Sequence, residues 1–342
     1  MTKILKQVAG IDVAQNELVV SLGKLDQSLC KEVYAYKTFA NKPSGLAALL
    51  TWVRKHSERE VAVHYVMEAT GVYHEKLAYY LSDQGLAISI VLPNKISSYM
   101  KTLEIKTITD KTASQAICQF ALERTLTLWQ QPKKVFRDLK QLTRERDQII
   151  AERTMAKNQL HAEQAEAFPN DSSIYRANQR IKLLNEQEKE IKQEIAVFLK
   201  TDQELHKKID LITSISGVGD LTAVIVLAET NGFELIRNKK QLISFAGLDV
   251  IGKDSGTSVK GKPRISKKGN RYIRKAMHMP SLNAIRNDER FKAIFVRLVS
   301  KHGIKMKAAV AVQRKILEMI YTIWTTEKPY DKEYLQKANT AV

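Results

Sequence analysis

The stretch Val8-Ala9-Gly10-Ile11-Asp12-Val13-Ala14, at residues 8–14, decides the fold of the first part of the chain. It is a short apolar run interrupted by one acid, which is the pattern of a buried strand that carries a single carboxylate. Burying an unpaired charge is costly, so this carboxylate indicates a role other than packing. Asp12 is therefore the first candidate functional residue.

The residues on either side of this stretch predict alternating strands and helices over residues 7–125. Two further strands follow as a meander, and helices then alternate with two more strands, which is an α/β arrangement. The expected strands after the first are at 17–22, 32–39, 61–67 and 88–92. The expected helices begin near 41–43 and near 73, and run at 94–102 and 111–124.

Residues 133–205 differ in composition, with many Lys, Arg, Glu and Gln residues and apolar residues at helical spacing. A break at residues 168–173 separates two apolar stripes, which predicts two long helices in an antiparallel hairpin or coiled coil. We interpret this hairpin as a spacer and an oligomerisation arm. A clamp for nucleic acid is the alternative.

Residues 206–342 are predicted to be mostly helical, with an apolar helix near 309–325. The sequence Ile215-Ser216-Gly217-Val218-Gly219 lies between two helical patterns and resembles a helix-hairpin-helix element. Gly217 and Gly219 would let the turn approach a phosphate, next to the free N–H groups of the following helix. A plain tight turn is the alternative. The predicted domains are 1–130, 131–205 and 206–342.

The charge of the chain indicates a polyanionic partner. The 342 residues carry a formal charge of +18, and residues 251–342 hold 21 basic but only 7 acidic side chains. No acid occurs between Gly256 and Asn287, whereas an ordinary solvated surface mixes both signs. The sequence shows no membrane span or signal peptide, and its cysteines, Cys30 and Cys118, are expected to be thiols in the cytoplasm.

Three acids form the first group that is suited to chemistry. Asp12 lies in the first strand, Glu68 follows a second apolar strand, and Asp110 begins a helix. Carboxylates from neighbouring strand ends and a nearby helix can converge on Mg²⁺, which serves phosphodiester chemistry. For Asp110, a helix cap is the alternative. The scattered histidines form no convincing zinc site, and we find neither a Walker loop nor a dinucleotide fingerprint.

The segment 253–269 is the second such group, because it combines serine, glycine and many cations. Ser255 is followed by Gly256, and the surrounding cations could offset charge on a phosphate. Residue chemistry alone nevertheless favours a flexible basic loop that contacts DNA backbone. The predicted nucleic-acid-binding cations are Lys260, Lys262, Arg264, Lys267, Lys268, Arg271, Arg274 and Lys275.

Together these blocks resemble transposases of the insertion-sequence 110 family, which includes the 1111 group and the Piv-type DNA invertases. The matching blocks occur in family order along nearly the whole chain. They are Gly10 to Ala14, Glu68 to Tyr73, Thr109-Asp110 with Ala116-Ile117, Ile215 to Gly219, Phe245 to Leu248, Ser255 to Val259, and Ser266 to Gly269.

The resemblance implies a RuvC-like domain of the RNase H class with a DEDD metal site, a coiled coil, and a C-terminal transposase domain that holds a nucleophilic serine. Asp12, Glu68 and Asp110 match the first three acids, and Ser255 matches the serine. The fourth acid is replaced by Ala113. Either three acids suffice, or Ser114 or Thr112 contributes through water, or metal use is altered.

The resemblance further implies a DNA recombinase that uses Mg²⁺ and a covalent phosphoserine link. Its partners would be donor and target DNA, a structured noncoding guide RNA, and further copies of the chain in a homodimer or homotetramer. Two alternatives remain. One is a metal-dependent nuclease that resembles a Holliday-junction resolvase, and the other, suggested by Ala113, is a non-catalytic nucleic-acid adaptor.

Overall fold

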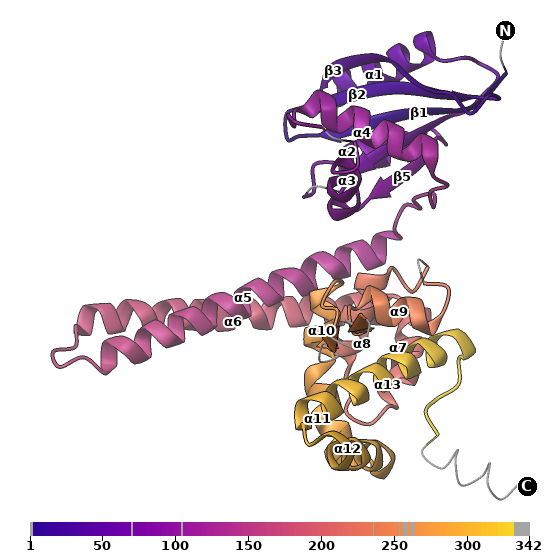
Figure 1. Ribbon diagram of the computed structural model, residues 1–342. Coiled ribbons are helices and arrows are strands. Elements are labelled where there is room, and N and C mark those ends of the chain that lie inside the picture. The colour runs from indigo at the N-terminus through magenta and orange to yellow at the C-terminus, as the bar shows by residue number, and fades with distance from the viewer. Residues whose placement is uncertain are drawn as a thin grey trace, which may run out of the picture. The chain divides into compact units, whose positions relative to one another are not determined.

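The computed structural model describes residues 3–69, 71–103, 105–234, 236–252, 254–255, 259–260 and 264–331, and for 254–255 and 259–260 it describes the backbone. The chain divides into two compact units, Met1–Gln131 and Pro132–Val342 (Figure 1). The further division of the second unit at residue 205 stays a prediction. Within the described residues, no helix has the length and apolar character needed to cross a membrane.

The first unit is built on one five-stranded sheet in the order β3-β2-β1-β4-β5. The first three strands form an antiparallel meander, and β4 and β5 run parallel to β1. The predicted α/β arrangement is confirmed. The strands are β1 (Ile4–Val13), β2 (Glu17–Asp26), β3 (Lys31–Ala40), β4 (Val63–Glu68) and β5 (Ala87–Val91).

Two pairs of helices cover the two faces of this sheet. Because side chains alternate along a strand, Ile11 packs with α1 and α2, whereas Val8 and Val66 pack with α3 and α4. Both faces of the central strands are thus buried, which explains their continuous apolar sequence. The helices are α1 (Pro43–His56), α2 (Glu75–Asp83), α3 (Pro93–Met100) and α4 (Asp110–Glu123).

The second unit combines a long helical hairpin with a helical bundle. As predicted, two long helices, α5 (Lys134–Gln164) and α6 (Asp171–Thr201), pack against each other (Figure 1). The other helices are α7 (Gln203–Thr213), α8 (Asp220–Thr230), α9 (Lys239–Phe245), α10 (Arg271–Ala276), α11 (His278–Asn287), α12 (Glu289–His302) and α13 (Lys305–Thr326). Two short strand pairs join β6 (Val250–Ile251) to β9 (Arg264–Ile265) and β7 (Asp254–Ser255) to β8 (Val259–Lys260).

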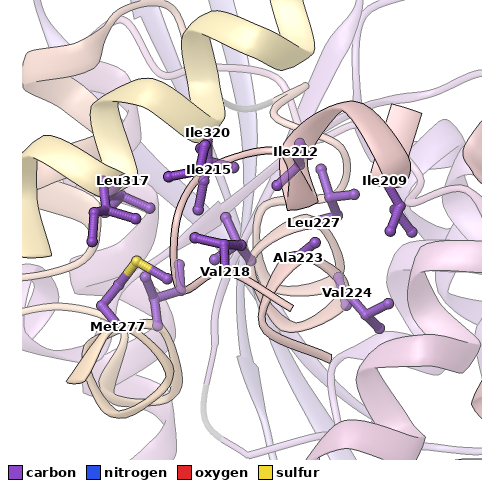
Figure 2. Close-up of a cluster of buried hydrophobic side chains, with 14 of the residues drawn as sticks. Ile209, Ile212, Ile215, Val218, Ala223, Val224, Leu227, Met277, Leu317 and Ile320 are labelled. Atoms are coloured by element: carbon purple, nitrogen blue, oxygen red, sulfur yellow. The ribbon is translucent and has the colours of Figure 1, made fainter. Parts of the chain in front are cut away.

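Apolar side chains from distant helices form the core of this bundle. Figure 2 shows Ile212 of α7, Leu227 of α8, and Leu317 and Ile320 of α13 in one cluster with Met277. All five are fully buried. The cluster explains why the apolar face of the last helix, which the sequence predicts, lies in the core.

The long hairpin is held together by one buried carboxylate as well as by apolar contacts. Glu188 of α6 accepts hydrogen bonds from Arg146 (2.8 Å) and Arg153 of α5, and Lys192 lies 2.9 Å away. Burial alone would raise the pKa of Glu188, but the hydrogen bonds from Lys192 and Arg153 and the charge of Arg146 outweigh it and hold this pKa at about 2.

We expect Glu188→Gln to lower the free energy of unfolding at pH 7 by about 3 kcal/mol, because it leaves two half-buried arginines without their counter-charge. The folded-state pKa lies below the usual 4.5. The stabilisation is therefore present above about pH 4.5, and it is lost as the pH falls toward 2. The difference between the two proteins should shrink over that range.

Urea unfolding of the full chain, followed by circular dichroism, measures this difference. Glu190→Gln is the matched control, because Glu190 is exposed on the same helix and should change stability by less than about 0.5 kcal/mol. Equal unfolding midpoints for wild type and Glu188→Gln at pH 7 would contradict the assignment.

Candidate active site

Asp12 and Glu68 lie at the carboxyl ends of two adjacent parallel strands. Gly10 pairs with Val66 and Ile11 pairs with Met67, so the two acids follow at neighbouring positions of β1 and β4. Alternation places both of them on the sheet face that α3 and α4 cover. The fold therefore brings together two acids that are 56 positions apart in the sequence.

Gly10 allows α4 to cross β1 closely on this face. A Cβ atom at Gly10 would lie 2.4 Å from the backbone nitrogen of Cys118, so a larger residue would displace the helix. The first residue of α4 is Asp110. Thr109 is the cap, since its side chain accepts a hydrogen bond from the backbone N–H of Thr112 at 3.2 Å. Capping therefore does not require Asp110.

The other two acids act electrostatically on Asp12. Burial, followed by the charges of Asp110 and Glu68, raises the pKa of Asp12 to about 6. Within the described ranges, no three His, Cys, Asp or Glu side chains are close enough together to hold one metal ion. The donor chemistry nevertheless fits a divalent cation, because carboxylate oxygens are the ligands that Mg²⁺ prefers and a cation would relieve their repulsion. The assignment of the three acids to a metal stays a prediction.

The position of the missing fourth acid, Ala113, lies one turn after Asp110 on α4, and the hydroxyls beside it are engaged elsewhere. The buried Ser114 hydroxyl lies 2.8 Å from that of Ser21 and donates to the Lys111 carbonyl at 2.9 Å. The hydroxyl of Thr112 donates to the Thr109 carbonyl at 2.9 Å. Both side chains serve the helix and its packing.

Ser255 lies on a small antiparallel pair of strands in the second unit. It ends β7 and pairs with Val259 of β8. A second pair, β6 with β9, brackets this segment and joins Val250 to Ile265. Next to that pair, the Ser266 hydroxyl donates to Asp249 at 2.5 Å. Residues 253, 256–258 and 261–263 lie outside the described residues.

The predicted DNA-binding cations have different surroundings. Arg264, Lys267 and Lys268 are exposed. Arg274 is directed inward and donates to the Ala246 and Gly269 carbonyls at 2.8 and 3.0 Å, while Lys275 pairs with Asp147 and Arg271 donates to the Tyr272 hydroxyl at 3.1 Å. Lys262 and the side chain of Lys260 lie outside the described residues.

The two glycines of the predicted helix-hairpin-helix element also differ. Gly217 has a φ of +87°, and a Cβ atom there would lie 2.6 Å from the Pro280 carbonyl oxygen of α11. Both the conformation of the turn and the packing against α11 therefore require a glycine at position 217. Gly219 is the N-cap of α8, and a Cβ atom there would meet open space. Of the two, Gly219 has the surroundings that close approach of a phosphate requires.

Comparisons with known proteins place most of the chain in one group. A family model described as "Transposase" of the DEDD type matches residues 9–169, and a model described as "Transposase IS116/IS110/IS902 family" matches residues 209–295. The pilin gene-inverting protein of Moraxella bovis is 26% identical over 333 residues, which cover 96% of this chain and 98% of that protein. The transposase for insertion sequence element IS1111A of Coxiella burnetii is 23% identical and covers 78% of each.

Among solved structures, the RuvC protein of Thermus thermophilus matches with a TM-score of 0.28 and 12% identity. This match covers 36% of the present chain and 99% of RuvC.

Proposed function

The chain belongs to the insertion-sequence 110 family of transposases and is a DNA recombinase, and from this premise we propose that it cleaves and rejoins DNA through a phosphoserine intermediate on Ser255. One observation carries the proposal. Ser255 lies in the part of the chain that the second family model matches, and it begins a run of 33 residues, 255–287, that contains no acid and many cations. Such a run favours a phosphodiester as the substrate.

The proposed reaction exchanges one phosphate ester for another. The Oγ atom of Ser255 loses its proton and bonds to phosphorus, while the bond from phosphorus to one sugar oxygen breaks and that oxygen takes up a proton. The phosphate then links Ser255 to one DNA end, so the energy of the ester bond is conserved for rejoining. A sugar hydroxyl of the new strand reverses the exchange and frees Ser255.

The acids of the first unit are proposed to bind a metal ion for this reaction. Asp12, Glu68 and Asp110 would hold Mg²⁺, which when bound supplies positive charge beside the reacting phosphodiester. Two observations support this role, namely the position of Asp12 and Glu68 on one face of adjacent parallel strands and the raised pKa of Asp12. A carboxylate that is costly for the protein to keep charged is typical of a functional site.

The partners we propose are donor DNA, target DNA and a structured noncoding guide RNA. The exposed cations Arg264, Lys267 and Lys268 would hold the phosphate backbone, and the N-terminus of α8 at Gly219 offers a further phosphate contact. The guide RNA rests on the resemblance to the family.

Several copies of the chain are needed, because recombination cuts several strands. We propose a homodimer or homotetramer joined through the α5–α6 hairpin. Exposed apolar side chains on this hairpin support such an arm, among them Met155, Leu183 and Val197.

Trapping the covalent intermediate tests the proposal. The full chain is incubated with labelled DNA that carries the ends of the element, with RNA transcribed from the adjoining noncoding region, and with Mg²⁺, and the reaction is stopped with detergent. We expect labelled DNA to migrate with the denatured protein until a protease releases it. Cleaved DNA that is free of protein in every sample would contradict the proposal and favour a hydrolytic nuclease.

A further inference from the structure

A cavity of about 500 Å³ lies between the β6–β9 strand pair and the hairpin of α12 and α13. We call it the α12–α13 cleft. Its lining contains both apolar side chains, such as Leu298 and Val310, and the cations Arg264, Lys267 and Arg314. Val250 of β6 and Arg264 of β9 both line the cleft. These two strands flank the segment that holds Ser255, so the cleft adjoins both ends of that segment.

The charge of the cleft has one sign. Among the described residues, four lysine and arginine side chains line it, no Asp or Glu side chain does, and His302 is the remaining titratable group. In the part of the chain that the structure describes, none of these four cations takes part in an ion pair. Elsewhere in the second unit, cations such as Lys275, Lys292 and Lys315 pair with a carboxylate. Four like charges around one cavity therefore fit an anionic ligand.

The apolar part of the lining restricts this ligand further. Val250, Ile304 and Met306 all line the cleft, and they are 56%, 47% and 58% exposed. A surface that binds only phosphate does not need apolar side chains in its lining. A groove that binds an apolar peptide does not need four cations in its lining. An unpaired nucleotide meets both requirements, since its base is flat and apolar on its faces and its phosphates are anionic.

We propose that the α12–α13 cleft receives one unpaired nucleotide of a nucleic-acid strand, with the base against the apolar floor and the flanking phosphates on Arg264, Lys267, Lys307 and Arg314. This site rests on the proposed function, because a recombinase must separate bases near the point of strand exchange. Lys307 and Arg314 lie more than 40 residues beyond Arg264, outside the basic segment that the sequence marks.

Binding of short single strands to the full chain tests the proposal. Fluorescence anisotropy compares a ten-nucleotide DNA with one of equal length in which every base is absent. We expect the wild type to bind the complete strand about fivefold more tightly, which is the lower end of the roughly 5- to 150-fold that a base stacked on an aromatic side chain contributes, because the apolar lining of the cleft is aliphatic. Val310→Trp should fill the cleft and remove that preference, while binding of the strand without bases stays unchanged.

A double variant and its matched control test the role of the cleft's cations in the same assay. The double variant K307Q/R314Q should bind both strands more weakly. It should also lower the slope of log Kd against log salt by about 0.7 for each phosphate contact that is lost. Lys315→Gln is the matched control, because Lys315 is exposed on α13 and pairs with Glu318, and it should change neither strand. Thermal unfolding shows that each variant is folded. Should Val310→Trp fail to fold, Val310→Met serves in its place.

The same strands made as RNA identify the source of the nucleotide. A base preference for DNA, RNA or both that is lost in Val310→Trp supports the cleft and names the source. Strands that bind with no base preference, or with one that Val310→Trp keeps, overturn the cleft but leave the phosphoserine proposal intact. Variants that change only the oligomeric mass in sedimentation also overturn it, since a second copy then covers the cleft. Failure to trap a covalent adduct, by contrast, would leave the base preference unaffected.

Discussion

Asp12→Asn and Glu68→Gln should each lower the rate of DNA cleavage by at least about a hundredfold, while the chain folds and binds DNA as before. The expected loss follows from the several kcal/mol that a bound cation supplies to phosphate chemistry, at 1.36 kcal/mol for each factor of ten. Both substitutions keep the shape of the side chain and remove its charge. Asp83→Asn is the matched control, because Asp83 is exposed at the end of α2, and it should cleave at the wild-type rate.

Stability distinguishes a catalytic from a structural role for Asp12. Its carboxylate is partly buried and is repelled by Asp110 and Glu68, so the charge costs the folded state free energy. Asp12→Asn should therefore leave the unfolding midpoint unchanged or raise it. A variant that retains full cleavage, or one that loses activity only because it unfolds, would remove Asp12 from the catalytic group.

Ser255→Ala should abolish the covalent adduct and strand exchange, by at least about a thousandfold, because loss of a nucleophile leaves only the contribution of binding and charge. Binding of DNA and RNA should persist, since the hydroxyl contributes little to a contact surface that rests on cations. Ser258→Ala should have the milder effect if Ser258 only supports the loop. Equal losses in both variants would assign the effect to the loop as a whole.

Much of the fold could be predicted from local patterns. The short apolar run at residues 8–14 and the helical spacing in residues 133–205 indicate their elements directly, because each pattern reports which faces must be buried. The meander of three strands followed by alternating helices and strands also predicts an α/β sheet. Gly10 illustrates what such patterns omit. Its contact with Cys118 depends on where α4 crosses the sheet, which residue spacing alone does not give.

The candidate sites depend on contacts between residues far apart in the sequence. The basic segment around Ser255 suggests Arg274 and Lys275 as DNA ligands, but only the fold shows that Arg274 is directed toward backbone carbonyls and that Lys275 pairs with Asp147. Lys307 and Arg314 show the reverse case. They lie in the basic region 251–342, but no motif distinguishes them there, and they become candidates because the hairpin of α12 and α13 brings them to the cavity that Arg264 lines.

The buried acid of α8 is another residue whose role the sequence leaves unmarked. Glu229 accepts hydrogen bonds from Arg144 at 2.7 and 2.9 Å and from Asn270 at 2.6 Å. Asn270 is in turn the N-cap of α10. Glu229 thus connects the start of α10 to α5 of the long hairpin, through partners that lie 85 and 41 positions away in the sequence.

Mass spectrometry of the DNA-linked peptide identifies the residue that attacks the phosphodiester. The reaction with labelled element ends is stopped with detergent, the protein and DNA are digested, and the peptide that retains a nucleotide is sequenced by fragmentation. We expect a phosphodiester link on Ser255. A link on Ser258, Ser266 or a tyrosine would contradict it, and cleavage without any linked peptide would show a nuclease in place of a serine recombinase.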